Sequence, residues 1–142
     1  MKPKWFHTSF FMIKVAAALI FDEYGNFLIA ERADGSLAGK WEFPGGKIEE
    51  GETENEAVVR EIMEELGVQV VTEKIVGVFS HAYPDREVEL ILIQCFLSED
   101  QKIISDGSHS SHAWVALSDC EKYDFAPLDR EIVEFLNQAN TK

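Results

Sequence analysis

The chain is poor in cysteine and in positive charge, and it lacks any long apolar run. Two cysteines, Cys95 and Cys120, are too few for a disulfide framework, and their spacing matches no metal-binding motif. The 13 lysines and arginines are outnumbered by 26 aspartates and glutamates, which gives a formal net charge of −13. This charge argues against a nucleic-acid polymer as partner, because its phosphates attract cationic side chains. No segment is long enough to span a membrane, and we expect a cytoplasmic protein.

The N-terminus loosely imitates a signal peptide, because Lys2 and Lys4 precede an apolar stretch. Lys14 interrupts that stretch, which then continues into a predicted hairpin, so we reject this interpretation. The 142 residues fit a single domain with a hydrophobic core. We expect residues 1–9 to form a loose arm and residues 139–142 a flexible tail. The sequence leaves open whether the protein is a monomer or a homodimer.

Hydrophobic patterning predicts five strands and two helices. The strands are expected at residues 14–21, 27–31, 70–80, 87–97 and 112–117, and the helices at residues 54–66 and 130–138. Residues 87–97 carry apolar side chains on both faces, which indicates a central strand. Strands on both sides of a helix, followed by a final helix, predict the α/β class, with a mixed sheet sandwiched between helices.

The first predicted helix has clear ends. Thr53 and Glu56 have the spacing of a capping box, which satisfies two backbone N–H donors at a helix start. Gly67 suits the left-handed conformation that ends a helix. The apolar residues of this helix fall on one arc, which we expect to face the core.

The other face of this helix is acidic. Glu61, Glu64 and Glu65 are spaced i, i+3 and i+4, so they share one side of the helix. Like charges this close repel by roughly 0.2–0.5 kcal/mol per pair, and a bound cation would stabilise them. Mg²⁺ prefers oxygen ligands and usually shares them with substrate phosphates. The alternative is a solvated face on which Glu56, Arg60 and Glu64 form i, i+4 ion pairs.

A longer motif contains this helix. Gly46, five residues, Glu52, seven residues and then the run REIMEELGV at residues 60–68 match the Nudix box at every defined position. The chain therefore resembles the Nudix hydrolases. Segments 41–47, 83–86 and 125–129 resemble the MutT-like branch, which includes enzymes acting on 8-oxo-dGTP and on CTP or modified pyrimidine nucleotides. The resemblance covers roughly residues 13–137 and implies the Nudix-type α/β/α sandwich.

The resemblance implies that water cleaves a phosphoanhydride of a nucleoside triphosphate, releasing a nucleoside monophosphate and pyrophosphate with the help of Mg²⁺ or Mn²⁺. The implied metal ligands are Glu61, Glu64, Glu65 and the backbone carbonyl of Gly45. Glu61 is also a candidate general base, and Arg60 would hold it in place. Lys47 is either a phosphate ligand or a solvated loop lysine. Glu52 is expected to be a structural acid near the helix N-terminus.

Asp129 gives the sharpest indication of the base. It stands where 8-oxoguanine-selective MutT proteins carry a base-reading Asn. An ionised Asp only accepts hydrogen bonds, which suits N4 of cytosine or N1 and N2 of guanine, whereas a protonated Asp would mimic Asn. The alternative is that Asp129 caps the helix predicted at residue 130. The other implied substrate-binding residues are Arg32, Phe43, Tyr83 and Arg86, while Trp41 and Phe125 are expected in the core.

Ser108 departs from the MutT-like pattern. Many such enzymes carry a Glu six residues before the tryptophan that matches Trp114. Asp106 and His109 are candidates to replace it. His109 and His112 are three residues apart, but a zinc site would need further ligands.

Two alternative functions remain. One is hydrolysis of another nucleoside diphosphate derivative, such as an ADP-sugar or a dinucleoside polyphosphate. The other is a nucleotide-binding sensor with weak catalysis, against which the intact acidic pairs of the box argue.

Overall fold

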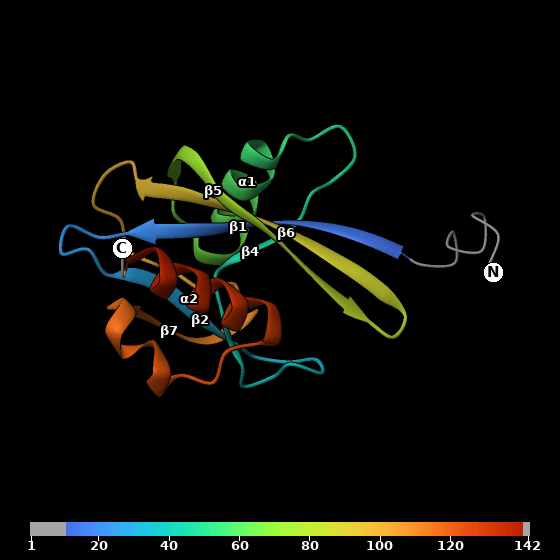
Figure 1. The fold of residues 1–142 in the computed structure, drawn as a ribbon. Helices are drawn as coiled ribbons and strands as arrows, with labels where there is room; N and C mark the ends of the chain where they lie inside the picture. Colours follow the sequence, from blue (N-terminus) through green and yellow to red (C-terminus); the bar gives the residue numbers. More distant parts are fainter. Residues whose placement is uncertain (1–10, 141–142) are drawn as a thin grey trace, which may run out of the picture.

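The computed structural model describes residues 11–140, so the predicted N-terminal arm and residues 141–142 of the predicted tail lie outside the described residues. The elements follow in the order β1 (Phe11–Phe21), β2 (Phe27–Arg32), β3 (Trp41–Glu42), β4 (Gly45–Lys47), α1 (Glu54–Leu66), β5 (Val70–Tyr83), β6 (Arg86–Leu97), β7 (His109–Val115), the 3-10 helix η2 (Leu117–Lys122) and α2 (Pro127–Asn140). Figure 1 shows the long β-strands crossing between the two helices.

The strands form one mixed sheet. Its order is β3-β2-β1-β6-β5, with β4 also paired to β1 and β7 to β2. β1 and β6 run parallel from Phe11 beside Arg86 to Phe21 beside Phe96, while the other pairs are antiparallel. The mixed sheet and the central position of β6 confirm the prediction.

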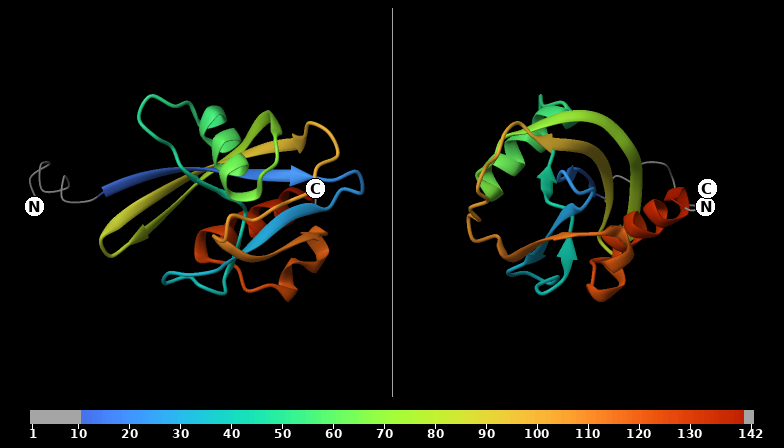
Figure 2. Two further views of the ribbon diagram at one scale, coloured as in Figure 1. Left: turned by 180° about the vertical axis from the view of Figure 1, so that it is seen from behind. Right: turned by 90° about the vertical axis from the view of Figure 1, so that its left-hand side faces the viewer.

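Each face of the sheet carries its own apolar cluster. Alternate residues of β1 point to opposite faces, as strand geometry requires, so Ala17 and Leu19 belong to one cluster and Ala16 and Ala18 to the other. α1 covers the second cluster with Ala57, Val58, Ile62 and Leu66, and α2 covers the first with Leu128, Ile132 and Val133. The end-on view in Figure 2 shows the two helices on opposite sides of the sheet, which is the predicted α/β/α sandwich.

The ends of α1 agree with the sequence. The Thr53 hydroxyl accepts a hydrogen bond from the backbone N–H of Glu56 at 3.1 Å, and the Thr53 N–H donates to the Glu56 carboxylate at 2.9 Å. Gly67 ends the helix in the left-handed conformation, with a φ of 66°.

Other boundaries differ from the prediction. β7 begins at His109 rather than at residue 112, and α2 begins at Pro127 rather than at residue 130. Proline suits the first helical position, because its missing N–H would have no partner there. α2 continues to Asn140, so residues 139 and 140 are helical and not part of a tail. The sequence analysis also did not anticipate η2 as a helix. Within residues 11–140, neither helix is long and apolar enough to cross a bilayer.

Candidate active site

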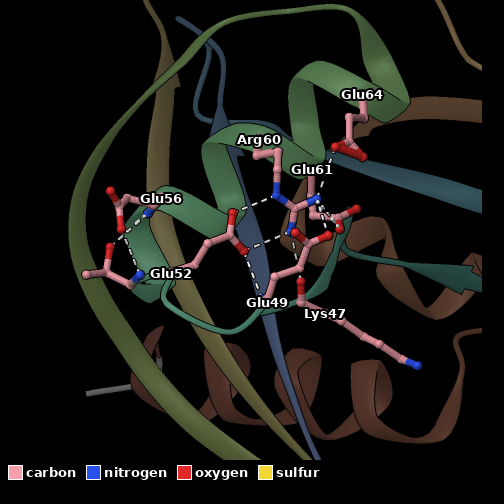
Figure 3. A network of polar contacts seen from close by, with 8 residues as sticks. Lys47, Glu49, Glu52, Glu56, Arg60, Glu61 and Glu64 are labelled. Atoms are coloured by element: carbon pink, nitrogen blue, oxygen red, sulfur yellow. Dashed lines mark hydrogen bonds and ion pairs between the residues drawn. The ribbon is translucent and has the colours of Figure 1, made fainter.

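Arg60 is the centre of the polar network on α1 (Figure 3). Its Nε and Nη2 donate to the two carboxylate oxygens of Glu52 at 2.6 and 2.9 Å, and Nη2 also donates to the backbone carbonyl of Lys47 at 3.0 Å. These hydrogen bonds from Arg60 lower the pKa of Glu52 to about 2. Glu52 therefore has the structural role predicted for it. The Lys47 side chain extends away from this network in Figure 3.

The other side of the guanidinium holds two predicted metal ligands. Arg60 Nη1 donates to Glu61 at 2.9 Å and to Glu64 at 3.1 Å. The Glu52, Glu64 and Glu61 carboxylates together raise the pKa of Arg60. The predicted contact of Arg60 with Glu61 is thus present, as is the i, i+4 pair with Glu64. Glu56 instead belongs to the capping box.

Glu65 lies in a different environment. Its carboxylate is largely buried, and within residues 11–140 its Oε1 has no hydrogen-bond partner. Burial raises its pKa to about 8, helped by the charges of Glu61, Glu42 and Asp106 and opposed by a hydrogen bond from the Gly45 backbone. A buried oxygen without a partner fits the ligand set of a hard cation.

The carboxylates do not converge on one point as they stand. No group of three acidic, histidine or cysteine side chains in the described part of the chain forms a ready metal site. Arg60 accounts for this arrangement, because it holds Glu61 and Glu64 by hydrogen bonds while Glu65 is turned inward. The metal ligands remain a prediction.

Two glycines of β4 allow this strand to approach its neighbours closely. A Cβ on Gly45 would collide with the backbone of β1 at Ala16 and would lie 2.6 Å from Cα of Ala17. A Cβ on Gly46 would instead collide with the carboxylate of Glu61. The backbone at Gly46 therefore lies directly against that carboxylate.

A cavity of about 310 Å³ begins at β4. It is lined by all five residues predicted to bind the substrate, Arg32, Phe43, Tyr83, Arg86 and Asp129, and by the β4 residues Gly45, Gly46 and Lys47. Because Gly46 lines the cavity and also contacts Glu61, the acidic face of α1 and the cavity adjoin at this residue.

Asp129 lies in the first turn of α2. Since that helix begins at Pro127, the alternative that Asp129 is its N-cap is wrong. The residue is 6% exposed, and its Oδ1 accepts the backbone N–H of Phe43 at 2.9 Å. Burial, with the negative charge of Glu42, raises the pKa of Asp129 to about 8.

The predicted aromatic residues differ in their surroundings. The guanidinium of Arg86 lies 4.6 Å from the centre of the Tyr83 ring, in a cation–π contact at the cavity wall. Phe43 is 3% exposed, and its ring lies 5.5 Å from Phe27 and 6.1 Å from Phe125. This packing favours a core role for the Phe43 ring, leaving its backbone N–H to hold Asp129. Phe125 is buried in the core as expected.

Comparison with known proteins agrees with this geometry. A family model described as the NUDIX domain matches residues 16–135. The chain belongs to the Nudix family. Over 127 residues it is 32% identical to an 8-oxo-dGTP diphosphatase of Escherichia coli K12, covering 89% of this chain and 97% of the relative. It is also 34% identical to a CTP pyrophosphohydrolase of the same organism, covering 87% and 90%.

The fold comparison gives the same result. The crystal structure of a MutT protein from Methanosarcina mazei Go1 matches with a TM-score of 0.82 at 29% identity, covering 94% of this chain and 98% of that one. The family and the fold class predicted from the Nudix box are thereby confirmed.

The sequence analysis missed one part of this Nudix site. Glu42 accepts a hydrogen bond from Arg32 Nη1 at 3.1 Å, and its other oxygen lies 2.9 Å from Nε2 of His109. His109 is buried, whereas His112 is exposed, so the two do not form a zinc pair. The only sequence signal was the polar Glu42 between the apolar residues Trp41 and Phe43.

The loop before β7 reaches the acidic face of α1. The backbone N–H of Asp106 donates to the carbonyl of Glu65 at 2.9 Å, and the hydroxyl of Ser108 donates to the Asp106 carboxylate at 2.6 Å. Hydrogen bonds from Ser108 lower the pKa of Asp106. Of the two candidates to replace the family's loop Glu, Asp106 has a backbone contact with Glu65, while His109 is engaged with Glu42.

Proposed function

We propose that this Nudix hydrolase cleaves nucleoside triphosphates to a nucleoside monophosphate and pyrophosphate, and so removes oxidised or modified nucleotides. The observation that carries the proposal is the position of Gly46, which lines the cavity and lies against the Glu61 carboxylate. A nucleotide with its base near Asp129 would have its phosphates beside the acidic face of α1. The relatives named as acting on 8-oxo-dGTP and CTP support these as substrates.

Glu61, Glu64, Glu65 and the carbonyl of Gly45 would hold Mg²⁺ or Mn²⁺. The buried Oε1 of Glu65, which has no partner in the described chain, supports this ligand set. A net charge of −13 opposes the approach of a polyphosphate, and a bridging cation would offset this repulsion. When bound, a divalent cation neutralises phosphate oxygens and polarises the bond to be cleaved.

The residues of the chain would then have separate roles in the reaction. Glu61 takes a proton from the attacking water, and Arg60 keeps its carboxylate in position through the 2.9 Å hydrogen bond. The water oxygen bonds to phosphorus as the anhydride bond breaks, and pyrophosphate leaves. Glu64 completes the acidic face, and Lys47, at the mouth of the cavity, contributes a positive charge toward the phosphates.

The cavity would select the base. Its volume of about 310 Å³ lies within the range of small-molecule sites. Burial raises the pKa of Asp129 to about 8, which favours the protonated carboxyl at neutral pH, and in this form it can both donate and accept, as an Asn does. Arg32 and Arg86 line the same cavity and offer cationic donors to base or phosphate oxygens, and Tyr83 offers a ring for stacking.

A screen of pyrophosphate release with and without Mg²⁺ tests the proposal. The panel contains the standard nucleoside triphosphates, 8-oxo-dGTP, 5-methyl-dCTP, ADP-ribose and a diadenosine polyphosphate, with Glu61→Gln as the control. We expect metal-dependent turnover of a guanine or cytosine triphosphate that Glu61→Gln abolishes. Asp129→Asn should then keep the preference among bases, because its amide also donates and accepts, whereas Asp129→Ala should change that preference by about tenfold.

Other outcomes lead to different conclusions. Activity confined to ADP-ribose or the dinucleotide would keep the Nudix chemistry and discard the role given to Asp129. Nucleotide binding without turnover in either protein would favour a sensor.

A further inference from the structure

Three charged or polar side chains are linked by hydrogen bonds across adjacent strands at the edge of the cavity. Glu42 lies on β3, Arg32 ends β2 and His109 begins β7, and β2 is hydrogen-bonded to both of the other strands. Arg32 and His109 are partners in the register of β2 and β7. The contact between His109 and Glu42 joins residues 67 positions apart in the sequence.

Glu42 connects the other two residues. One carboxylate oxygen accepts from Arg32 Nη1 at 3.1 Å, and the other lies 2.9 Å from Nε2 of His109. The side chains of Glu42 and His109 are 16% and 3% exposed, so water competes little for these hydrogen bonds. A carboxylate fixed at both oxygens has little freedom to rotate, which in turn limits the orientation of Arg32.

Arg32 is also fixed at its backbone. Its N–H donates to the carbonyl of Lys40, and its carbonyl accepts from Gly39, both at 2.9 Å. Its side chain lines the cavity, and its Nε is buried with no hydrogen-bond partner among the residues that the structure describes. Because Nε is shielded from solvent, the exchange of its proton with water reports how firmly the guanidinium is held.

We propose that His109 is a positioning residue of the substrate cavity: by holding Glu42, it fixes the guanidinium of Arg32 at the cavity wall, where the guanidinium meets the substrate. The part of this proposal that concerns substrate rests on the proposed function. The part that concerns Arg32 does not, because it follows from the His109–Glu42–Arg32 contacts alone.

Substitutions at His109 separate the hydrogen bond from the packing. His109→Phe keeps a ring of similar size and removes the donor to Glu42, while His109→Gln places an amide donor near the position of Nε2. His109→Asn is small and polar, but its amide is too short to reach Glu42, so it repeats the test if the Phe variant does not fold. His112→Phe is the matched control, because His112 lies exposed on the same strand.

The first readout is the Nε–H signal of Arg32 in ¹H–¹⁵N NMR of the full chain, assigned by its loss in Arg32→Lys. We expect a sharp, slowly exchanging signal in the wild type, in His109→Gln and in His112→Phe. The signal should broaden or disappear in His109→Phe and His109→Asn. A persistent sharp signal in both of these variants would overturn the proposal.

The second readout is the affinity for the non-hydrolysable analogues α,β-methylene-dGTP and α,β-methylene-dCTP. His109→Phe should weaken binding about tenfold, His109→Gln should restore it, and His109→Phe should have no further effect in an Arg32→Ala background. Additive losses in the double variant would show that His109 acts independently of Arg32 and would refute the proposal. If the wild type binds neither analogue and turns over no nucleotide of the panel, the proposed function fails, and the Arg32 signal alone then decides whether His109 positions Arg32.

Discussion

Arg60 and Glu52 face each other in a two-point contact, with Nε 2.6 Å from Oε2 and Nη2 2.9 Å from Oε1. Glu52 precedes α1 and Arg60 lies in its second turn, so this contact ties the loop to the helix. It also fixes the plane of the guanidinium, which directs Nη1 toward Glu61 and Glu64. Glu52 thus helps to position the Glu61 and Glu64 carboxylates through Arg60, although it forms no hydrogen bond with either of them in this network.

Replacing Arg60 by Lys should reduce turnover. Lysine keeps the charge but has no planar fork, so it cannot bind Glu52 at two points and still hold Glu61. We expect kcat to fall by about tenfold to a hundredfold, with a smaller change in KM, since the orientation of the base is lost. Steady-state kinetics on the best substrate of the panel would measure this. Arg130→Lys on the exposed face of α2 is the control, and an unchanged kcat in Arg60→Lys would contradict the role of Arg60.

Substitution by alanine should have different effects at the two glycines of β4, Gly45 and Gly46. At Gly45 the added Cβ meets the backbone of Ala16 and Ala17, which cannot move without distorting β1. We expect Gly45→Ala to lower the free energy of unfolding by about 1–3 kcal/mol. At Gly46 the three atoms nearest to the Cβ all belong to the Glu61 carboxylate, a flexible side-chain end. Gly46→Ala should therefore fold normally and lose turnover.

Urea unfolding and kinetics on both variants would check this contrast. Each glycine variant serves as the control for the other. Equal destabilisation by the two substitutions would mean that Gly46 is needed for folding rather than for the approach to Glu61.

The parts of the structure that sequence predicts well are local. The capping box of Thr53 and Glu56, the left-handed Gly67 and the acidic face of α1 all follow from spacing within one helix. The apolar side chains on both faces of β6 likewise indicated an interior strand, and β6 lies between β1 and β5 in the sheet. Such features depend on residues only a few positions apart, so the spacing of residue types in the sequence is enough to predict them.

The contacts that shape the cavity are not local. Asp129 binds the N–H of Phe43, 86 residues earlier in the chain, and His109 meets Glu42 across 67 residues. No spacing rule relates these pairs, because sheet topology brings them together. The N-cap alternative for Asp129 was wrong for a local reason, since α2 begins at Pro127, three residues before the residue 130 that a cap at Asp129 requires.

Asp129 should make the stability of the protein depend on pH. Its pKa rises from an ordinary 3.8 to about 8 in the fold, so between these values the folded state binds more protons than the unfolded state. The free energy of unfolding therefore falls as the pH rises through this window. Asp129→Asn removes this titration while its amide oxygen still accepts from Phe43, so we expect a shallower decline with pH.

Urea unfolding at several pH values between about 5 and about 8, with EDTA present, measures the difference in slope. Glu65 has a similarly raised pKa and contributes equally to both proteins, so the difference isolates Asp129. Asp124→Asn is the control, because Lys40 lowers the pKa of Asp124 and its contribution is lost only at lower pH. Parallel slopes for wild type and Asp129→Asn would show that Asp129 is ionised throughout this window.

Divalent cations should stabilise the folded protein through Glu65. A ligand that binds only the folded state adds about 2.7 kcal/mol at a concentration one hundred times its Kd. Mg²⁺ or Mn²⁺ should therefore raise the urea midpoint of the wild type and raise it less in Glu65→Gln and Glu64→Gln. Because burial holds the pKa of Glu65 near 8, the cation must displace a proton, and the stabilisation should grow as the pH rises toward 8.

A chain with a net charge of −13 also attracts cations without a specific site. Glu99→Gln distinguishes the two effects, because Glu99 is an exposed carboxylate that lines a separate pocket with Asp22 and Asp100. Removing one charge there should leave the cation-induced shift of the midpoint intact. If Glu65→Gln and Glu99→Gln reduce the shift equally, the cation acts by general screening, and the buried oxygen of Glu65 is not its ligand.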